Sequence, residues 1–153
     1  MQLNRFNVRA YGVCVVDGKA LMTDEIRGGK LMAKFPGGGL ELGEGLEDCL
    51  IREFMEEANV KIRVKKLLYI NPFLQISGMR KSDQLLSVYY EIELLEELNV
   101  TITHKPFDFP TMENNQQVFR WVEVDSLTPD DFTFPVDKAL CPLLVEWFGS
   151  KGA

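Results

Sequence analysis

The chain has 153 residues, of which 46% are hydrophobic and 26% are charged, a composition typical of a globular domain with its own core. Its formal net charge of −6 argues against nucleic acid or an anionic membrane as a partner, because both require a positive surface. A single histidine, His104, leaves no basis for a metal site built on several histidines.

The three cysteines, Cys14, Cys49 and Cys141, are odd in number and lie among apolar neighbours. They are expected to be reduced core thiols, not a disulfide framework or a zinc site. No apolar run approaches the roughly 20 residues needed to cross a bilayer, and residues 1–10 lack the apolar stretch of a signal peptide. We therefore expect one cytoplasmic domain over residues 1–153.

Alternating, β-branched and aromatic residues predict six strands. These cover residues 7–16, 19–25, 30–35, 61–76, 83–96 and 118–124. Asp17-Gly18, between the first two, is a strong hairpin signal. The run from Pro36 to Gly39 is expected to end the third strand, and the polar residues 103–117, with two prolines, are predicted to form a long loop.

Two segments have the periodicity of α-helices, residues 46–58 and residues 137–149. The second follows Pro135, a residue favoured at helix starts, and ends at Gly149. Strands around a mid-chain helix, followed by a terminal helix, predict an α/β (α+β) fold with a mixed sheet between helices.

The first predicted helix concentrates negative charge on one face. Its apolar residues form a core stripe: Leu50, Ile51, Phe54 and Ala58. Glu53, Glu56 and Glu57 occupy the neighbouring face at spacing i, i+3, i+4, so their carboxylates lie close together. Arg52 can pair with Glu56 or with Asp48, but one guanidinium cannot neutralise the group.

Such a face could simply be solvated. Solvent-facing helices usually alternate lysine with glutamate, however, and here the nearest downstream lysine, Lys61, lies beyond the helix. A hard divalent cation such as Mg²⁺ removes the repulsion because it binds carboxylate oxygens. The preceding residues, 36–45, include five glycines, which allow either a flexible turn or a close approach of backbone to a ligand. We favour a metal site.

This segment resembles the signature of the Nudix family, G-x5-E-x7-R-E-U-x-E-E-x-G-U, in which U is aliphatic. Seven of its nine defined positions match: Gly38, Glu44, Arg52, Glu53, Glu56, Glu57 and Val60. Asn59 stands where the family has glycine, at a helix end where a left-handed conformation is expected and where asparagine is tolerated. Phe54 replaces an aliphatic residue, which is a matter of packing.

The resemblance implies a Nudix-type α/β/α sandwich in which residues 38–60 form a loop–helix–loop. It also implies a pyrophosphohydrolase that cleaves a nucleoside diphosphate linked to another group by attack of water at phosphorus, with Mg²⁺ or Mn²⁺ as cofactor. The substrate would be a small nucleotide or nucleotide sugar, whose identity stays open.

The same resemblance assigns residue roles. Glu53, Glu56, Glu57 and the backbone carbonyl of Gly37 would bind the metal ion. Arg52 would orient the glutamates, Gly38 and Glu44 would support the loop, and either Glu53 or Glu56 would accept the proton of the attacking water. Glu113, in the long loop, is a possible additional ligand or only a solvated charge.

Two other readings compete with an enzyme. One is a catalytically silent Nudix-fold module that binds or senses a nucleotide, and the other is an interaction domain whose acidic helix contacts a partner. Phe107 and Phe109 are candidates for the rim of a substrate pocket. A homodimer is possible, since the strands predicted over residues 61–97 could offer a pairing edge.

Overall fold

The computed structural model describes residues 2–150, so residues 1 and 151–153 of the predicted domain lie outside the described residues. The chain divides into two compact units. The first comprises the residues up to Val13 together with Gly37–Leu98, and the second comprises Cys14–Pro36 together with the residues from Asn99 onward. In the described part of the chain, no helix is long and apolar enough to cross a membrane.

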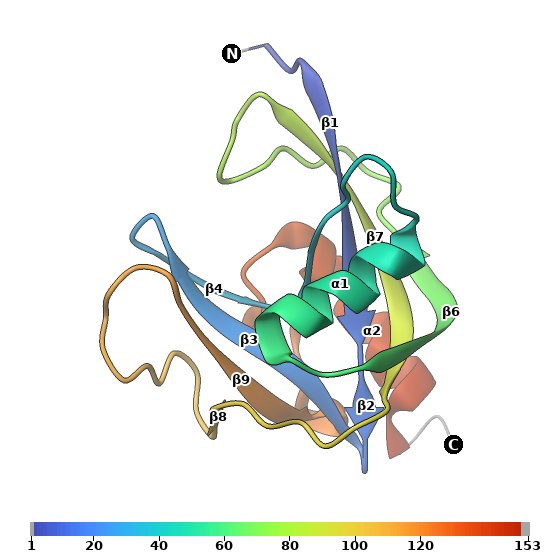
Figure 1. The fold of residues 1–153 in the computed structure, drawn as a ribbon, viewed down its shortest axis with the longest axis vertical. Coiled ribbons are helices and arrows are strands. Elements are labelled where there is room, and N and C mark those ends of the chain that lie inside the picture. The colour runs from blue at the N-terminus through green and yellow to red at the C-terminus, as the bar shows by residue number, and fades with distance from the viewer. Residues whose placement is uncertain (1, 151–153) are drawn as a thin grey trace. The chain divides into compact units, whose positions relative to one another are not determined.

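The first unit is a four-stranded mixed sheet with one helix (Figure 1). The strand order is β5 (Gly37–Gly39), β1 (Arg5–Val13), β7 (Asp83–Leu94) and β6 (Ile62–Ile70). Strands β1 and β7 are parallel, and the other pairs are antiparallel. This arrangement places the residues after β5 directly before the helix.

Helix α1 (Leu46–Ala58) has the bounds predicted from the sequence. It packs against the sheet through Cys49, Leu50, Phe54 and Ala58, all of which are buried. Gly12 in β1 allows this packing, because a Cβ there would lie 2.8 Å from Cε2 of Phe54. The helix ends at Asn59, whose φ of 48° and ψ of 44° confirm the expected left-handed conformation.

The second unit is a mixed sheet with a terminal helix. Its strands are β2 (Val15–Val16), β3 (Lys19–Arg27), β4 (Lys30–Lys34), β8 (Ile102–Thr103) and β9 (Gln116–Glu123). The sheet has the order β2-β3-β9-β8, with β4 also paired to β3, and only β8 and β9 are parallel. Two short 3₁₀ helices, η1 (Val124–Ser126) and η2 (Pro129–Asp131), precede α2 (Pro135–Phe148).

Three predicted elements differ from the structure. The strand predicted over residues 7–16 is two strands, because β1 and β2 belong to different sheets. The third predicted strand does end before Pro36, but Gly37–Gly39 form β5 and pair with residues of β1, which the sequence did not predict. The strand predicted over residues 61–76 ends at Ile70.

The remaining predicted elements agree in type with the structure, although both ends of the loop predicted over residues 103–117 belong to strands β8 and β9. Asp17 and Gly18 both have positive φ, as a two-residue hairpin turn requires. The predicted terminal helix is present and begins at Pro135 itself. Two mixed sheets and two helices confirm the mixed α/β class.

Candidate functional site

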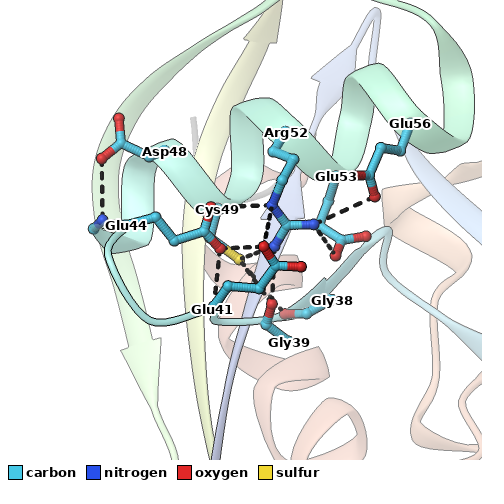
Figure 2. A network of polar contacts seen from close by, with 10 residues as sticks. Gly38, Gly39, Glu41, Glu44, Asp48, Cys49, Arg52, Glu53 and Glu56 are labelled. Carbon is cyan, nitrogen blue, oxygen red and sulfur yellow. Dashed lines mark hydrogen bonds and ion pairs between the residues drawn. The ribbon is translucent and has the colours of Figure 1, made fainter.

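Arg52 is the centre of the predicted site, which lies in the first unit except for Glu113 (Figure 2). One edge of its guanidinium, Nε and Nη2, donates to both carboxylate oxygens of Glu44 at 3.0 and 2.7 Å. Nη1 donates to Glu53 at 2.9 Å and to Glu56 at 3.3 Å. A single cation therefore holds the loop with one edge and the acidic face of α1 with the other.

Backbone groups and a further carboxylate complete this network. Nη2 of Arg52 donates to the carbonyl of Gly39 at 3.0 Å, and Glu41 lies 3.7 Å from Nε. The amide of Glu41 in turn donates to Glu44 at 3.0 Å. Sequence reasoning missed Gly39 and Glu41. A backbone carbonyl carries no sequence signal, and Glu41 lies just inside the glycine-rich loop as an ordinary surface acid.

The charges of the network shift the pKa values of Glu44 and Arg52 in opposite directions. Hydrogen bonds from Arg52, and then from the amide of Glu41, lower the pKa of Glu44 to about 2. The carboxylates raise the pKa of Arg52, with the bond to Glu44 as the largest cause. Glu44 and Arg52 thus stay ionised over the whole neutral range.

Because Gly38 has no side chain, the carboxylate of Glu53 can lie against β5. A Cβ at Gly38 would lie 2.6 Å from Oε2 of Glu53, well inside the 3.4–4 Å of ordinary contact, and closer still to Cδ and Oε1. Glu53 has a side chain that is only 14% exposed, whereas the side chain of Glu56 is 59% exposed. The glycine therefore leaves room for a carboxylate where any other residue would place its own side chain.

Cys49 is a packing residue in this setting. Its thiol is buried and lies 3.5 Å from the carbonyl of Gly39. Burial, followed by the negative charge of Glu44, raises the pKa of the thiol to about 12. The thiol stays protonated, which makes it a poor nucleophile.

The N-terminus of α1 is fixed by Asp48. Its carboxylate accepts the amide of Gly45 at 3.0 Å, so Asp48 does not serve as the partner of Arg52. An acid in the first helical turn also complements the helix dipole. The helix that carries the glutamates thus has a defined start.

The predicted metal ligands supply the oxygen chemistry that Mg²⁺ and Mn²⁺ prefer. The bonds from Arg52 use one oxygen of Glu53 and one of Glu56. Glu57 lies on the same helix, and Gly37 lies in β5 opposite Tyr11. Among residues 2–150, however, no three acidic, histidine or cysteine side chains converge closely enough to form a ready cation site. Carboxylate and carbonyl oxygens fit such an ion, while Glu53 and Glu56 are held by their hydrogen bonds from Arg52.

Glu113 is the one predicted residue that lies outside the first unit. It belongs to the loop between β8 and β9 in the second unit, where it is exposed. Its role as an additional ligand stays a prediction.

Comparison with known families decides what this arrangement represents. A family model described as the NUDIX domain matches residues 6–143. The chain belongs to the Nudix family. The enzyme class predicted from the sequence, a hydrolase acting on phosphoric anhydride bonds, is confirmed by membership of this family.

Several solved structures resemble most of the chain. The E. coli ORF135 protein is 14% identical, with a TM-score of 0.68 over 97% of this chain and 95% of that chain. A Nudix hydrolase from Nitrosomonas europaea is 21% identical, with a TM-score of 0.65 over 92% and 88%. A MutT Nudix hydrolase from Burkholderia pseudomallei is 18% identical, with a TM-score of 0.64 over 93% and 99%. At such identities the likeness concerns the fold, and it confirms the predicted Nudix fold.

Proposed function

We propose that this Nudix protein is a pyrophosphohydrolase that cleaves a nucleoside diphosphate linked to another group by attack of water at phosphorus. The observation that carries the proposal is the imbalance of charge around Arg52. Within 4 Å of this one guanidinium lie carboxylates of Glu41, Glu44, Glu53 and Glu56. A site with this excess of negative charge can bind a diphosphate only if a cation lies between them.

The proposed cofactor is Mg²⁺ or Mn²⁺. Glu53, Glu56, Glu57 and the carbonyl of Gly37 would bind it. When bound, a divalent ion neutralises phosphoryl oxygens and makes a coordinated water more acidic.

The protein's own residues have three proposed tasks. Glu53 or Glu56 accepts the proton of the attacking water, as a carboxylate within reach of that water can do. Arg52 limits the rotamers of both side chains by its hydrogen bonds. Glu44 holds Arg52 by a bidentate, charge-assisted pair, the strongest geometry available to these groups.

We further propose that both compact units belong to one Nudix domain, because the family match over residues 6–143 includes parts of each. The partner is a small nucleotide, and the charge of −6 favours neither nucleic acid nor membrane. A homodimer stays possible. Cys49 and Cys141 are buried thiols outside any disulfide, which supports the cytoplasm as the compartment.

The deciding experiment measures formation of the nucleoside monophosphate from a panel of nucleoside diphosphate derivatives with Mg²⁺ or Mn²⁺. We expect turnover of at least one compound and complete loss of turnover with excess EDTA. Binding without turnover by any compound would instead identify a silent nucleotide-binding module. Turnover that persists in EDTA would exclude the metal role.

A matched pair of variants tests the acidic face itself. Glu57→Gln should abolish most turnover while leaving the thermal unfolding midpoint close to that of the wild type. Glu47→Gln removes an exposed carboxylate from the first turn of the same helix and should retain activity. Equal activity in the two variants would contradict the assignment of Glu57.

A further inference from the structure

The loop of residues 104–115, between β8 and β9 in the second unit, is a shaped segment. All of its residues are exposed except Phe107 and Phe109, which are partly buried. Their rings stack at a centroid distance of 6.4 Å and an interplanar angle of 29°. The loop therefore presents two partly buried aromatic rings within an otherwise exposed segment.

A buried ion pair holds this loop from beneath. The amide of Phe107 donates to Oδ2 of Asp24, in β3, at 3.1 Å. Arg120, in β9, donates to both oxygens of the same carboxylate at 2.6 and 2.9 Å. Asp24 is fully buried and Arg120 nearly so, so the carboxylate has little freedom to move.

The end of the loop is tied to the β3–β4 hairpin, beside which it runs (Figure 1). The amide of Asn115 donates to the carbonyl of Ile26 at 2.7 Å. The side chain of Asn114 accepts the amide of Gly29 at 2.8 Å. With the contact to Asp24, the loop is anchored both near its start and at its end.

Phe107 has a backbone conformation that is unfavourable for its residue type. Its φ is +55°, in the left-handed region that glycine and asparagine adopt readily and that bulky residues rarely adopt. A glycine at this position would relieve the strain. The ring gains only partial burial in return, so packing alone accounts poorly for a phenylalanine here.

We propose that Phe107, together with Phe109, forms a binding surface for a flat aromatic ring, the base of a nucleotide. Asp24 and Arg120 are positioning residues, since they hold the amide of Phe107 and so orient its ring. Stacking suits this surface because every base has an aromatic face, and a phenylalanine ring offers no hydrogen bond to select one base. This inference rests on the proposed function for the identity of the ligand as a nucleotide.

The test compares ligands with and without a base. Isothermal titration calorimetry with AMP, GMP, CMP and UMP, and with ribose 5-phosphate, measures binding without any scissile anhydride bond. The wild type should bind at least one nucleotide tenfold or more tightly than ribose 5-phosphate. Phe107→Ala should weaken nucleotide binding about 5- to 150-fold and leave ribose 5-phosphate within about twofold.

Three further variants separate stacking from a structural role. Phe107→Tyr should retain nucleotide affinity, and Phe107→Gly should lose it without lowering the thermal midpoint by more than about 2 °C, because glycine removes the backbone strain. Asp24→Asn should weaken nucleotide binding through the loop. Phe6→Ala, which removes an exposed phenylalanine from β1, should change nothing.

The inference is overturned if nucleotides and ribose 5-phosphate bind the wild type equally, or if Phe107→Ala weakens both alike. It is also overturned if Phe107→Gly lowers the midpoint strongly without changing affinity, since the ring would then be structural. Base-dependent binding by a protein that hydrolyses no compound would overturn the proposed function alone. Hydrolysis with base-independent binding would overturn this inference alone.

Discussion

Substitution of Gly38 by alanine tests the position of Glu53 directly. The new Cβ would lie 2.6 Å from Oε2 of Glu53, whereas ordinary contacts begin at 3.4 Å. The carboxylate must therefore move by about 1 Å, and a displacement of that size at a catalytic group can cost about 100-fold in rate. Because the atoms that must move end a flexible side chain, we expect the free energy of unfolding to fall by less than about 1 kcal/mol.

The assay is kcat for the best substrate of the nucleotide panel, together with urea unfolding. The two neighbouring glycines provide matched controls. A Cβ at Gly39 would lie 3.6 Å from Nη1 of Arg9, an ordinary contact, so Gly39→Ala should be active. Gly37→Ala should destabilise the fold, because its Cβ would press on the backbone of Ala10 and Tyr11 at a φ of +155°. Wild-type kcat in Gly38→Ala would refute the assignment of Glu53.

Three further predictions follow from contacts already described. Arg52→Lys should lower kcat about ten- to hundredfold, because an ammonium cannot replace a fork that donates to several carboxylates; an unchanged kcat would argue against the orienting role. Glu44 has a pKa lowered from 4.5 to about 2, so its contribution to stability is complete above about pH 4.5 and is lost as the pH falls toward 2. Urea midpoints between pH 5 and pH 2 should accordingly fall less in Glu44→Gln than in the wild type. An equal fall of the midpoint in both proteins would show that the bond to Arg52 does not stabilise the fold. Gly12→Ala should destabilise the protein by about 1–3 kcal/mol, because the added methyl group meets the ring of Phe54; an unchanged urea midpoint would mean that the helix shifts freely.

The parts of the fold that depend on local sequence were predictable. The apolar stripe and the acids of residues 46–58 define α1, although Ile51 of the predicted stripe is exposed and Cys49 is buried instead. Asn59 ends the helix in the left-handed conformation that its small polar side chain tolerates. The hairpin at Asp17 and Gly18 has the same local origin.

The parts that depend on distant backbone were not predictable. Gly37–Gly39 contain the residue type that usually interrupts a strand, yet they form β5 because β1 pairs with them. The change of sheet near Cys14 likewise depends on partners far along the chain. The sequence pattern could place Arg52 beside the glutamates, but it could not show that the carbonyl of Gly39 accepts a hydrogen bond from Arg52.

The two edges of the Arg52 guanidinium contact different parts of the site, and this affects what happens when a ligand binds or leaves. The edge formed by Nε and Nη2 secures the glycine-rich loop through Glu44, while Nη1 alone contacts Glu53 and Glu56. A ligand that draws the two helix acids away would break only the Nη1 contacts. The pair between Glu44 and Arg52 would remain. A ligand could therefore bind and leave without the glycine-rich loop having to refold in each catalytic cycle.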